Sequence, residues 1–304
     1  MRMKNAILAP ILVAVIFMLL VLTKYVNLEV LELNGNLYLS MAILQFLVFL
    51  LPSIFFCKLR GQNYISRLKL TPFGLEKIIF VVFAVFVMIL ACTAVRLGLH
   101  YLGFSPAEYT LYGTGVPTVN INIYDQVYIL IVFALIPAVT EEFLFRGVMY
   151  AEYEEAGAVS SILLTAILFA MMHFSLPEFP VYFCGGILLG LVLYITQSVI
   201  APMVVHFVYN LYSLFLEAYL FRFINRPENN IFFIFILLSL LLLFLTLMFS
   251  EAERVLYANG LKAKPTPEYV SKNSKRGRKF LTAVLSPTFL LCVAVYLLRA
   301  FHIF

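Results

Sequence analysis

Long apolar stretches separated by short polar segments follow one another along the whole chain. A helix needs roughly 17–25 mostly apolar residues to cross a bilayer, and nine stretches reach or approach this length. Two of them, 159–174 and 181–196, are short, which leaves eight spans as the alternative count. The pattern predicts an all-α protein, a polytopic transmembrane helical bundle with spans over 6–22, 37–57, 78–95, 127–149, 159–174, 181–196, 202–221, 231–249 and 280–298.

Composition supports this prediction and narrows the class of protein. Hydrophobic residues make up 63% of the chain and charged residues only 12%, whereas soluble domains average about 45–50% and about 25%. The first stretch follows Arg2 and Lys4, but it is too long for a signal peptide and no clear cleavage site follows it, so we expect an uncleaved span. No phosphate-binding or dinucleotide-binding motif is present. We therefore expect the lipid bilayer as a partner, and no nucleic acid.

The 21 lysines and arginines divide unevenly between the two sides of the predicted bundle. Fifteen fall on the side of the N-terminus and of the loops 58–77 and 251–279, five fall on the other side, and Arg146 lies within a span. The positive-inside rule then predicts a multi-pass protein of the cell membrane with a cytoplasmic N-terminus and an external C-terminus. The basic cluster 272–279 is interpreted as a cytoplasmic anchor, with binding of anionic lipid heads as the less favoured alternative.

Charged residues inside spans are costly and usually functional, and Glu141, Glu142 and Arg146 are the clearest case. Glu142 and Arg146 are four residues apart and share a helix face, so they can neutralise one another. Glu141 lies about 140° around the helix from Arg146 and has no partner on its own helix. An unpaired carboxylate in a medium of low dielectric binds a proton more readily, which suits a general base. A structural acid–base staple is the alternative.

Two further polar elements follow on later apolar stretches. His173 lies as many residues after the expected turn at Gly157 as Glu141 lies before it, so two antiparallel helices would bring both residues to one level, about 24 Å from the turn. His206 and Asn210 are four residues apart and can both donate hydrogen bonds, as an oxyanion requires. Taken alone, each of these elements is more typical of structural hydrogen bonding than of catalysis. Glu217, near the external end, is interpreted as structural or loop-facing, His100 and His302 receive no role, and Cys57, Cys92, Cys184 and Cys292 are interpreted as small buried thiols.

The three motifs Glu141-Glu142-x-x-x-Arg146, Phe169-x-x-x-His173 and His206-x-x-x-Asn210 occur in this order on separate apolar helices. In this respect the chain resembles the CAAX-protease and bacteriocin-processing family of intramembrane endopeptidases, which includes the type II CAAX prenyl endopeptidases. The resemblance covers about residues 127–215, so we divide the chain into N-terminal spans with an external loop (1–126), a peptidase core (127–215) and C-terminal spans with the basic loop 251–279 (216–304).

The resemblance implies peptide-bond hydrolysis within the membrane, with a membrane-bound peptide or protein as the substrate and partner. By carry-over, Glu141 would activate water, His173 would assist, His206 and Asn210 would donate to the oxyanion, and Glu142 and Arg146 would support the site. Three of these side chains, Glu141, His173 and His206, could alternatively bind zinc or another divalent metal. Because no H-E-x-x-H motif is present, a glutamate-activated water without a required cofactor is favoured.

A non-enzymatic membrane protein is the second hypothesis. It would use the same polar cluster for immunity, partner binding or transport. Transport predicts polar residues along a path through the bilayer, whereas the sequence concentrates them in one cluster. This distribution favours the enzyme.

Overall fold

The computed structural model describes residues 8–23, 25, 37–104, 123–224, 230–258 and 277–301. Throughout these residues the regular structure is helical and contains no strand, which confirms the predicted all-α class. The α-helices are α2 (Pro10–Thr23), α3 (Leu37–Gln45), α4 (Leu51–Arg60), α5 (Ile78–Tyr101), α6 (Ile123–Ile129), α7 (Ile136–Glu142), α8 (Tyr150–Tyr153), α9 (Ala158–Met172), α10 (Phe179–Thr196), α11 (Ile200–Phe215), α12 (Glu217–Ile224), α13 (Asn230–Ala258) and α15 (Pro287–Ala300).

The described helices do not confirm the predicted count of nine spans. Among the described residues, five helices are long and apolar enough to cross a membrane: Tyr38–Arg60, Leu75–Tyr101, Gln126–Ala156, Phe179–Thr196 and Ile231–Ala258. A sixth arises if Gly277–Val284 and Pro287–Ala300, bent by 52°, form one span. The remaining three apolar helices, α2, α9 and α11, have 14, 15 and 16 residues, so each measures only about 21–24 Å against a hydrocarbon core of about 30 Å.

Two prolines explain why the long helices contain wider turns. The π-helical segments Phe46–Leu50 (η2) and Leu130–Leu135 (η6) directly precede helices with Pro52 and Pro137 in their first turns. A proline lacks the N–H of a regular helix and its ring clashes with the carbonyl four residues earlier. Wider i→i+5 turns accommodate this clash without ending the helix. A third π-helical segment, Phe143–Met149 (η7), starts directly after Glu142.

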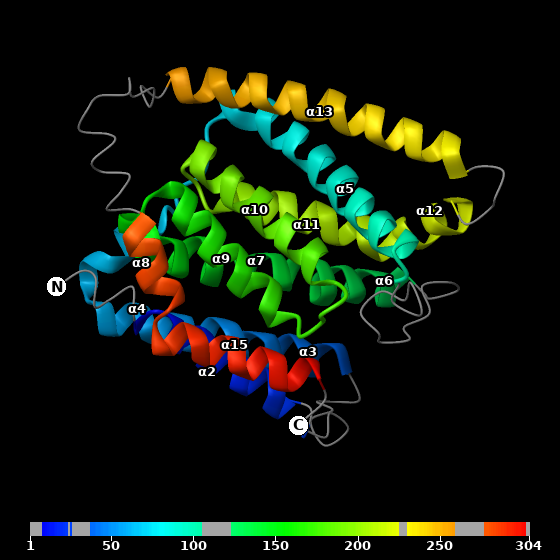
Figure 1. The fold of residues 1–304 in the computed structure, drawn as a ribbon. Helices are drawn as coiled ribbons and strands as arrows, with labels where there is room; N and C mark the ends of the chain where they lie inside the picture. Colours follow the sequence, from blue (N-terminus) through cyan, green and yellow to red (C-terminus); the bar gives the residue numbers. More distant parts are fainter. Residues whose placement is uncertain are drawn as a thin grey trace.

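The helices stack in layers, and Figure 1 shows their order. One outer layer contains α13 and α5, which pack together, and α10 and α11 lie against α5. Below them α9 contacts α10, and α7 contacts α11. The other outer layer contains α2 and α15, which pack together near α3 and α4. The helices from residue 123 to residue 215 are thus enclosed between earlier and later parts of the chain.

Two glycines allow α9 and α10 to approach closely. A Cβ added to Gly186 would lie 2.9 Å from both Cα and Cβ of Ala166, and one added to Gly190 would lie 3.0 Å from a methyl group of Ile162. Small residues four apart permit this kind of contact between membrane helices. The close approach has a polar consequence as well, because it brings the carbonyl of Gly186 to Arg146.

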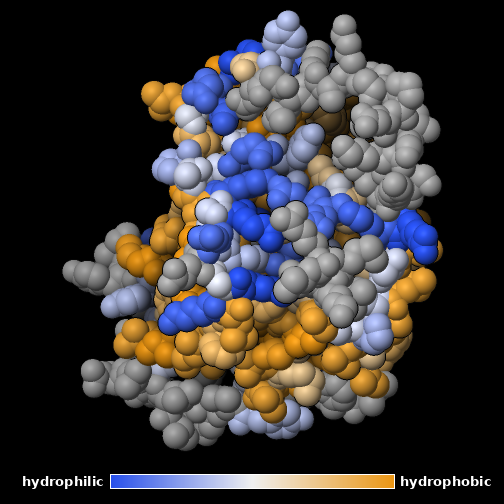
Figure 2. All heavy atoms as spheres, turned by 90° about the vertical axis from the view of Figure 1, so that its left-hand side faces the viewer, coloured by the Kyte–Doolittle hydropathy of each residue, from blue (hydrophilic) through white to orange (hydrophobic). Residues whose placement is uncertain are grey.

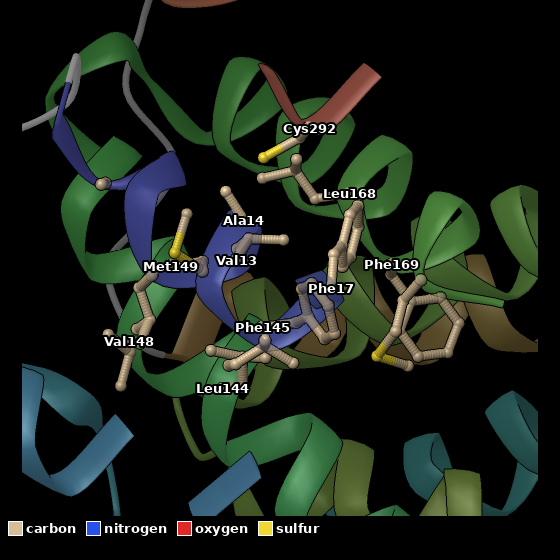
Figure 3. Close-up of a cluster of buried hydrophobic side chains, with 14 of the residues drawn as sticks. Val13, Ala14, Phe17, Leu144, Phe145, Val148, Met149, Leu168, Phe169 and Cys292 are labelled. Atoms are coloured by element: carbon tan, nitrogen blue, oxygen red, sulfur yellow. The ribbon is translucent and has the colours of Figure 1, made fainter. Parts of the chain in front are cut away.

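A buried apolar cluster joins the N-terminal and C-terminal helices to the central ones. Figure 3 shows Val13, Ala14 and Phe17 of α2 beside Leu144, Phe145, Val148 and Met149 of η7, with Leu168 and Phe169 of α9 and Cys292 of α15 completing the cluster. All of these side chains are buried. Residues far apart in the sequence therefore hold η7 and α9, which carry Arg146 of the first motif and Phe169 of the second.

One end of the molecule is polar. It lies on the left in Figure 1, and Figure 2 shows hydrophilic residues gathered across the middle of this face. Basic side chains form ion pairs there, Arg60 with Glu152 and Lys69 with Glu154. Two others donate hydrogen bonds to backbone carbonyls, Arg67 to Ala151 and Lys279 to Glu155. The N-terminal basic residues Arg2 and Lys4, most of the predicted external loop and the basic residues 272–276 lie outside the described residues.

Candidate active site

The pair predicted between Glu142 and Arg146 forms in the structure. Arg146 Nη1 donates to Glu142 Oε1 at 2.7 Å, and both side chains are fully buried. Arg146 Nη2 donates to the carbonyl of Gly186 at 2.9 Å, and the guanidinium carbon lies 4.6 Å from the centre of the Phe169 ring. Arg146 therefore joins η7 to both α9 and α10. A buried charge of this kind is stabilised by its partner and by the ring face.

Glu142 also binds the first imidazole of the site. Nδ1 of His206 lies 2.9 Å from Glu142 Oε1, the same oxygen that accepts from Arg146. A carboxylate accepts but does not donate, so Nδ1 of His206 carries the proton of this hydrogen bond. The other ring nitrogen, Nε2, is then an acceptor when His206 is neutral and a donor when His206 is charged.

Glu141 differs from Glu142 in having no ion-pair partner among the described residues, although Oε2 of both glutamates is buried and unsatisfied. Its Oε2 atom is buried and has no hydrogen-bond partner in the structure. The carboxylate lies within electrostatic range of His206, Glu142 and Arg146. A buried polar atom without a partner needs an explanation such as a catalytic role or a bound water. The unpaired glutamate predicted by the helix geometry is thus present, beside the pair that neutralises Glu142.

His173 stands at the end of α9, where its ring is oriented by two contacts. Nδ1 lies 3.0 Å from the carbonyl of Phe169, to which only a protonated nitrogen can bond, so Nε2 is left as an acceptor in the neutral ring. The imidazole stacks on the ring of Tyr182 at a centroid distance of 3.6 Å. Phe169 lies between the two imidazoles, 5.1 Å from the ring of His173 and 5.8 Å from that of His206. The three motifs therefore meet around Phe169.

Asn210 lies one turn after His206 on α11. Its Nδ2 atom donates to the carbonyl of Ala134 at 3.3 Å, and the residue is buried. An amide nitrogen has two N–H groups, so this bond engages one of them. The bond also ties α11 to η6, which directly precedes the helix of Glu141 and Glu142.

The side chains considered for a metal do not form a ligand set. Within the described residues, no group of three or more His, Cys, Asp or Glu side chains is placed to hold a metal ion. One carboxylate, Glu142, already binds Arg146 and the Nδ1 atom of His206. Glu141, His173 and His206, the set considered from the sequence, therefore do not fit a metal centre in this arrangement.

A second buried group of charges was not predicted. Arg96 of α5 donates to Glu178 through Nη2 at 2.7 Å and through Nε at 3.2 Å, and it also binds Glu217. Glu217 is buried, with an exposed fraction of 6%. This agrees with the structural interpretation of Glu217 and not with the loop-facing one. The expectation that ionisable residues concentrate in one cluster was wrong. Nothing in the local spacing signals this group, because its members lie 82 and 121 residues apart.

Comparison with known proteins gives one family. Residues 123–212 match the family model described as type II CAAX prenyl endopeptidase Rce1-like. The match covers less than a third of the 304-residue chain, and it includes all three motifs. No curated protein and no solved structure matches the chain. The family resemblance that the motifs predict is confirmed over this segment.

Proposed function

On the premise of this membrane endopeptidase family, we propose that the protein is an intramembrane endopeptidase that hydrolyses a peptide bond with a glutamate-activated water. The observation that carries the proposal is the buried, unpartnered Oε2 of Glu141 beside two imidazoles whose orientations are fixed by other bonds. A general base must be free to accept a proton from the reacting water. Oε1 of Glu142 bonds both Arg146 and His206, so Glu141, which pairs with neither, is the glutamate that we assign to this role.

In the proposed reaction, Glu141 takes a proton from water while the water oxygen attacks the carbonyl carbon of the substrate peptide. His173 helps to hold that water, because its Nδ1 proton is directed to the carbonyl of Phe169 and its Nε2 lone pair is left as an acceptor. The C–N bond then breaks as the proton passes to the leaving nitrogen. The products are one new carboxylate and one new amine.

The tetrahedral intermediate carries a negative oxygen, which we assign to donors on α11. One N–H of Asn210 remains after its bond to the carbonyl of Ala134. His206 donates to the oxyanion only when both of its nitrogens carry protons, with Nδ1 bonded to Glu142. Donors fixed before the reaction stabilise the developing charge without reorganisation.

The family name points to a C-terminal prenylated CAAX tail as the first substrate class to test. A fluorogenic peptide with such a tail is cleaved by the purified native protein in detergent, and Glu141→Gln lowers the rate by about 10²–10⁴-fold, the usual contribution of a general base. A matched control is Glu154→Gln. Glu154 lies near the end of the same long helical segment, Gln126–Ala156, and pairs with Lys69, and its side chain is 45% exposed.

Turnover by a folded Glu141→Gln protein at the native rate would contradict the assignment of the base. If the prenylated peptide is not cleaved, the membrane proteome of cells with the native protein is compared with that of cells with Glu141→Gln. New N-termini that depend on Glu141 would identify another substrate. The proposed mechanism needs no metal, so treatment with a strong chelator leaves the rate unchanged, and a loss restored by zinc would contradict this part.

The non-enzymatic alternative gains one observation, the second buried charge group of Arg96, Glu178 and Glu217. A proton relay could use two such groups. In proteoliposomes with a pH-sensitive dye, a transporter dissipates an imposed proton gradient, whereas the proposed peptidase leaves it unchanged. We also propose that the polar end with Arg60, Lys69 and Lys279 faces the cytoplasm, which labelling of single cysteines introduced at this end tests.

A further inference from the structure

The chain turns sharply directly after His173. Helix α9 ends at Met172, α10 begins at Phe179, and Phe174 has a φ angle of 50°. A bulky residue in the left-handed region is a conformational outlier, and it persists only where its surroundings hold it. The orientation of His173 therefore depends on whatever fixes the segment 173–178.

Three helices outside the family-matched segment contact this turn. From α2, the ring of Phe17 packs edge-on against Phe174 at 5.3 Å. From α15, the hydroxyl of Tyr296 donates to the carbonyl of Ser175 at 3.3 Å. From α5, Arg96 donates to Glu178. Ionic hydrogen bonds are the strongest of these contact types, so Arg96 is the principal candidate for holding the turn.

Arg96 bonds both the residue that precedes α10 and the first residue of α12. Two of its nitrogens, Nε and Nη2, donate to the same oxygen of Glu178, and Nη1 donates to Glu217 at the start of α12. The side chains of Arg96 and Glu178 are each only 12% exposed. A planar guanidinium can make these three directed bonds together, whereas the ammonium of a lysine cannot reproduce the fork.

Glu178 connects Arg96 to His173. It precedes α10, and its backbone carbonyl accepts from the amides of Val181 and Tyr182. The ring of Tyr182 is the one that stacks on His173 at 3.6 Å. A displacement of Glu178 would thus move the start of α10, and with it the aromatic surface that holds the imidazole.

We propose that Arg96 is a positioning residue for His173, acting through Glu178 and Tyr182. The matched segment 123–212 then does not complete the site alone, because α5 supplies the charge that fixes the His173 turn. This inference rests on the proposed endopeptidase function for its kinetic test. Its structural content, the orientation of one imidazole, has a separate readout.

The kinetic test uses Arg96→Met with Arg60→Met as the matched control. Arg60 also makes a partly buried ion pair with a glutamate, Glu152, but at the polar end of the molecule. Misplacement of a catalytic group by about 1 Å lowers the rate by about 100-fold, so Arg96→Met lowers kcat by about this factor with little change in KM. Arg60→Met leaves kcat unchanged, and Arg96→Lys recovers only part of the loss because one charge remains without the fork.

The second readout is the ¹⁵N spectrum of the imidazoles in detergent-solubilised protein, with the His173 signals assigned from His173→Gln. In native protein and in Arg60→Met, Nδ1 of His173 is protonated and Nε2 is not, as the bond to Phe169 requires. In Arg96→Met this single tautomer is replaced by an exchange average. A native protein without peptidase activity would contradict the proposed function, and this spectrum would still decide the positioning role.

The proposal is overturned if Arg96→Met keeps both the native kcat and the native His173 signals. If Arg96→Met does not fold, Glu178→Gln replaces it, because glutamine keeps the size of the side chain and removes the charge. Glu178→Gln is then expected to lower kcat and to broaden the His173 signals. Native values of both in a folded Glu178→Gln protein would also overturn the proposal.

Discussion

Two arginine–glutamate pairs of nearly equal length lie in different parts of the molecule. In the centre, Arg146 and Glu142 are 2.7 Å apart with both side chains fully buried. At the polar end, Arg60 and Glu152 are 2.6 Å apart, but the Arg60 side chain is 19% exposed. Sequence spacing predicts the first pair, whose residues are one helical turn apart. The second joins residues 92 apart and does not follow from any local pattern.

Their surroundings differ more than their geometry. Around Arg60 the neighbouring interactions tie the segment 62–68 to the end of the long central helix, as in the bond from Tyr64 to the carbonyl of Val148. Around Arg146 the same carboxylate also binds an imidazole, and the adjacent Glu141 keeps an unsatisfied oxygen. The comparison shows that an ion pair alone does not indicate a reactive site. Buried unsatisfied atoms occur at both pairs, so the imidazole of His206 on Glu142 and the adjacent glutamate without an ion-pair partner distinguish the central one.

Removing the glutamate from each pair is expected to have the largest effect on stability, and it tests the comparison between the two pairs directly. Glu142→Ala leaves the arginine fully buried without its charged partner, which lowers the free energy of unfolding by about 3–5 kcal/mol. Glu152→Ala is expected to lower it by less, because Arg60 can turn its exposed portion to water. Titration of each variant with SDS in mixed micelles measures both values. Equal losses would show that the environments of the two pairs do not differ energetically.

A smaller loss of stability is expected when the close packing of α9 and α10 beside the central pair is disturbed. Gly186→Ala places a methyl group 2.9 Å from Ala166 and displaces the carbonyl that accepts from Arg146. Overpacking of this kind lowers the free energy of unfolding by about 1–3 kcal/mol. Gly147→Ala is the matched control, since its added methyl group would lie 3.9 Å from the nearest side-chain atom.

The control should be neutral or slightly stabilising, because alanine favours a helix more than glycine does. The same SDS titration measures both glycine variants. A Gly186→Ala protein as stable as the native one would mean that α9 and α10 separate easily. The arginine site would then not depend on their close approach.

The sequence predicted those parts of the site that depend on short spacing. The bond between Glu142 and Arg146 and the freedom of Glu141 both follow from positions on one helix. The bond of His206 to Glu142 did not follow, because it depends on how α11 packs against α7. The stacking of Tyr182 on His173 likewise depends on the sharp turn at Phe174.

The smallest effect is expected at the exposed margin of the polar end. Lys69 pairs with Glu154 at 3.0 Å, with the glutamate side chain 45% exposed. Exposed ion pairs contribute about 0–1 kcal/mol, and salt screens them. Lys69→Met therefore lowers the free energy of unfolding by less than about 1 kcal/mol, and this difference disappears in high salt. The loss in Glu142→Ala persists in high salt, because the buried arginine is shielded from ions. A salt-independent loss in Lys69→Met would show that the polar end contributes to the folded core, as the centre does.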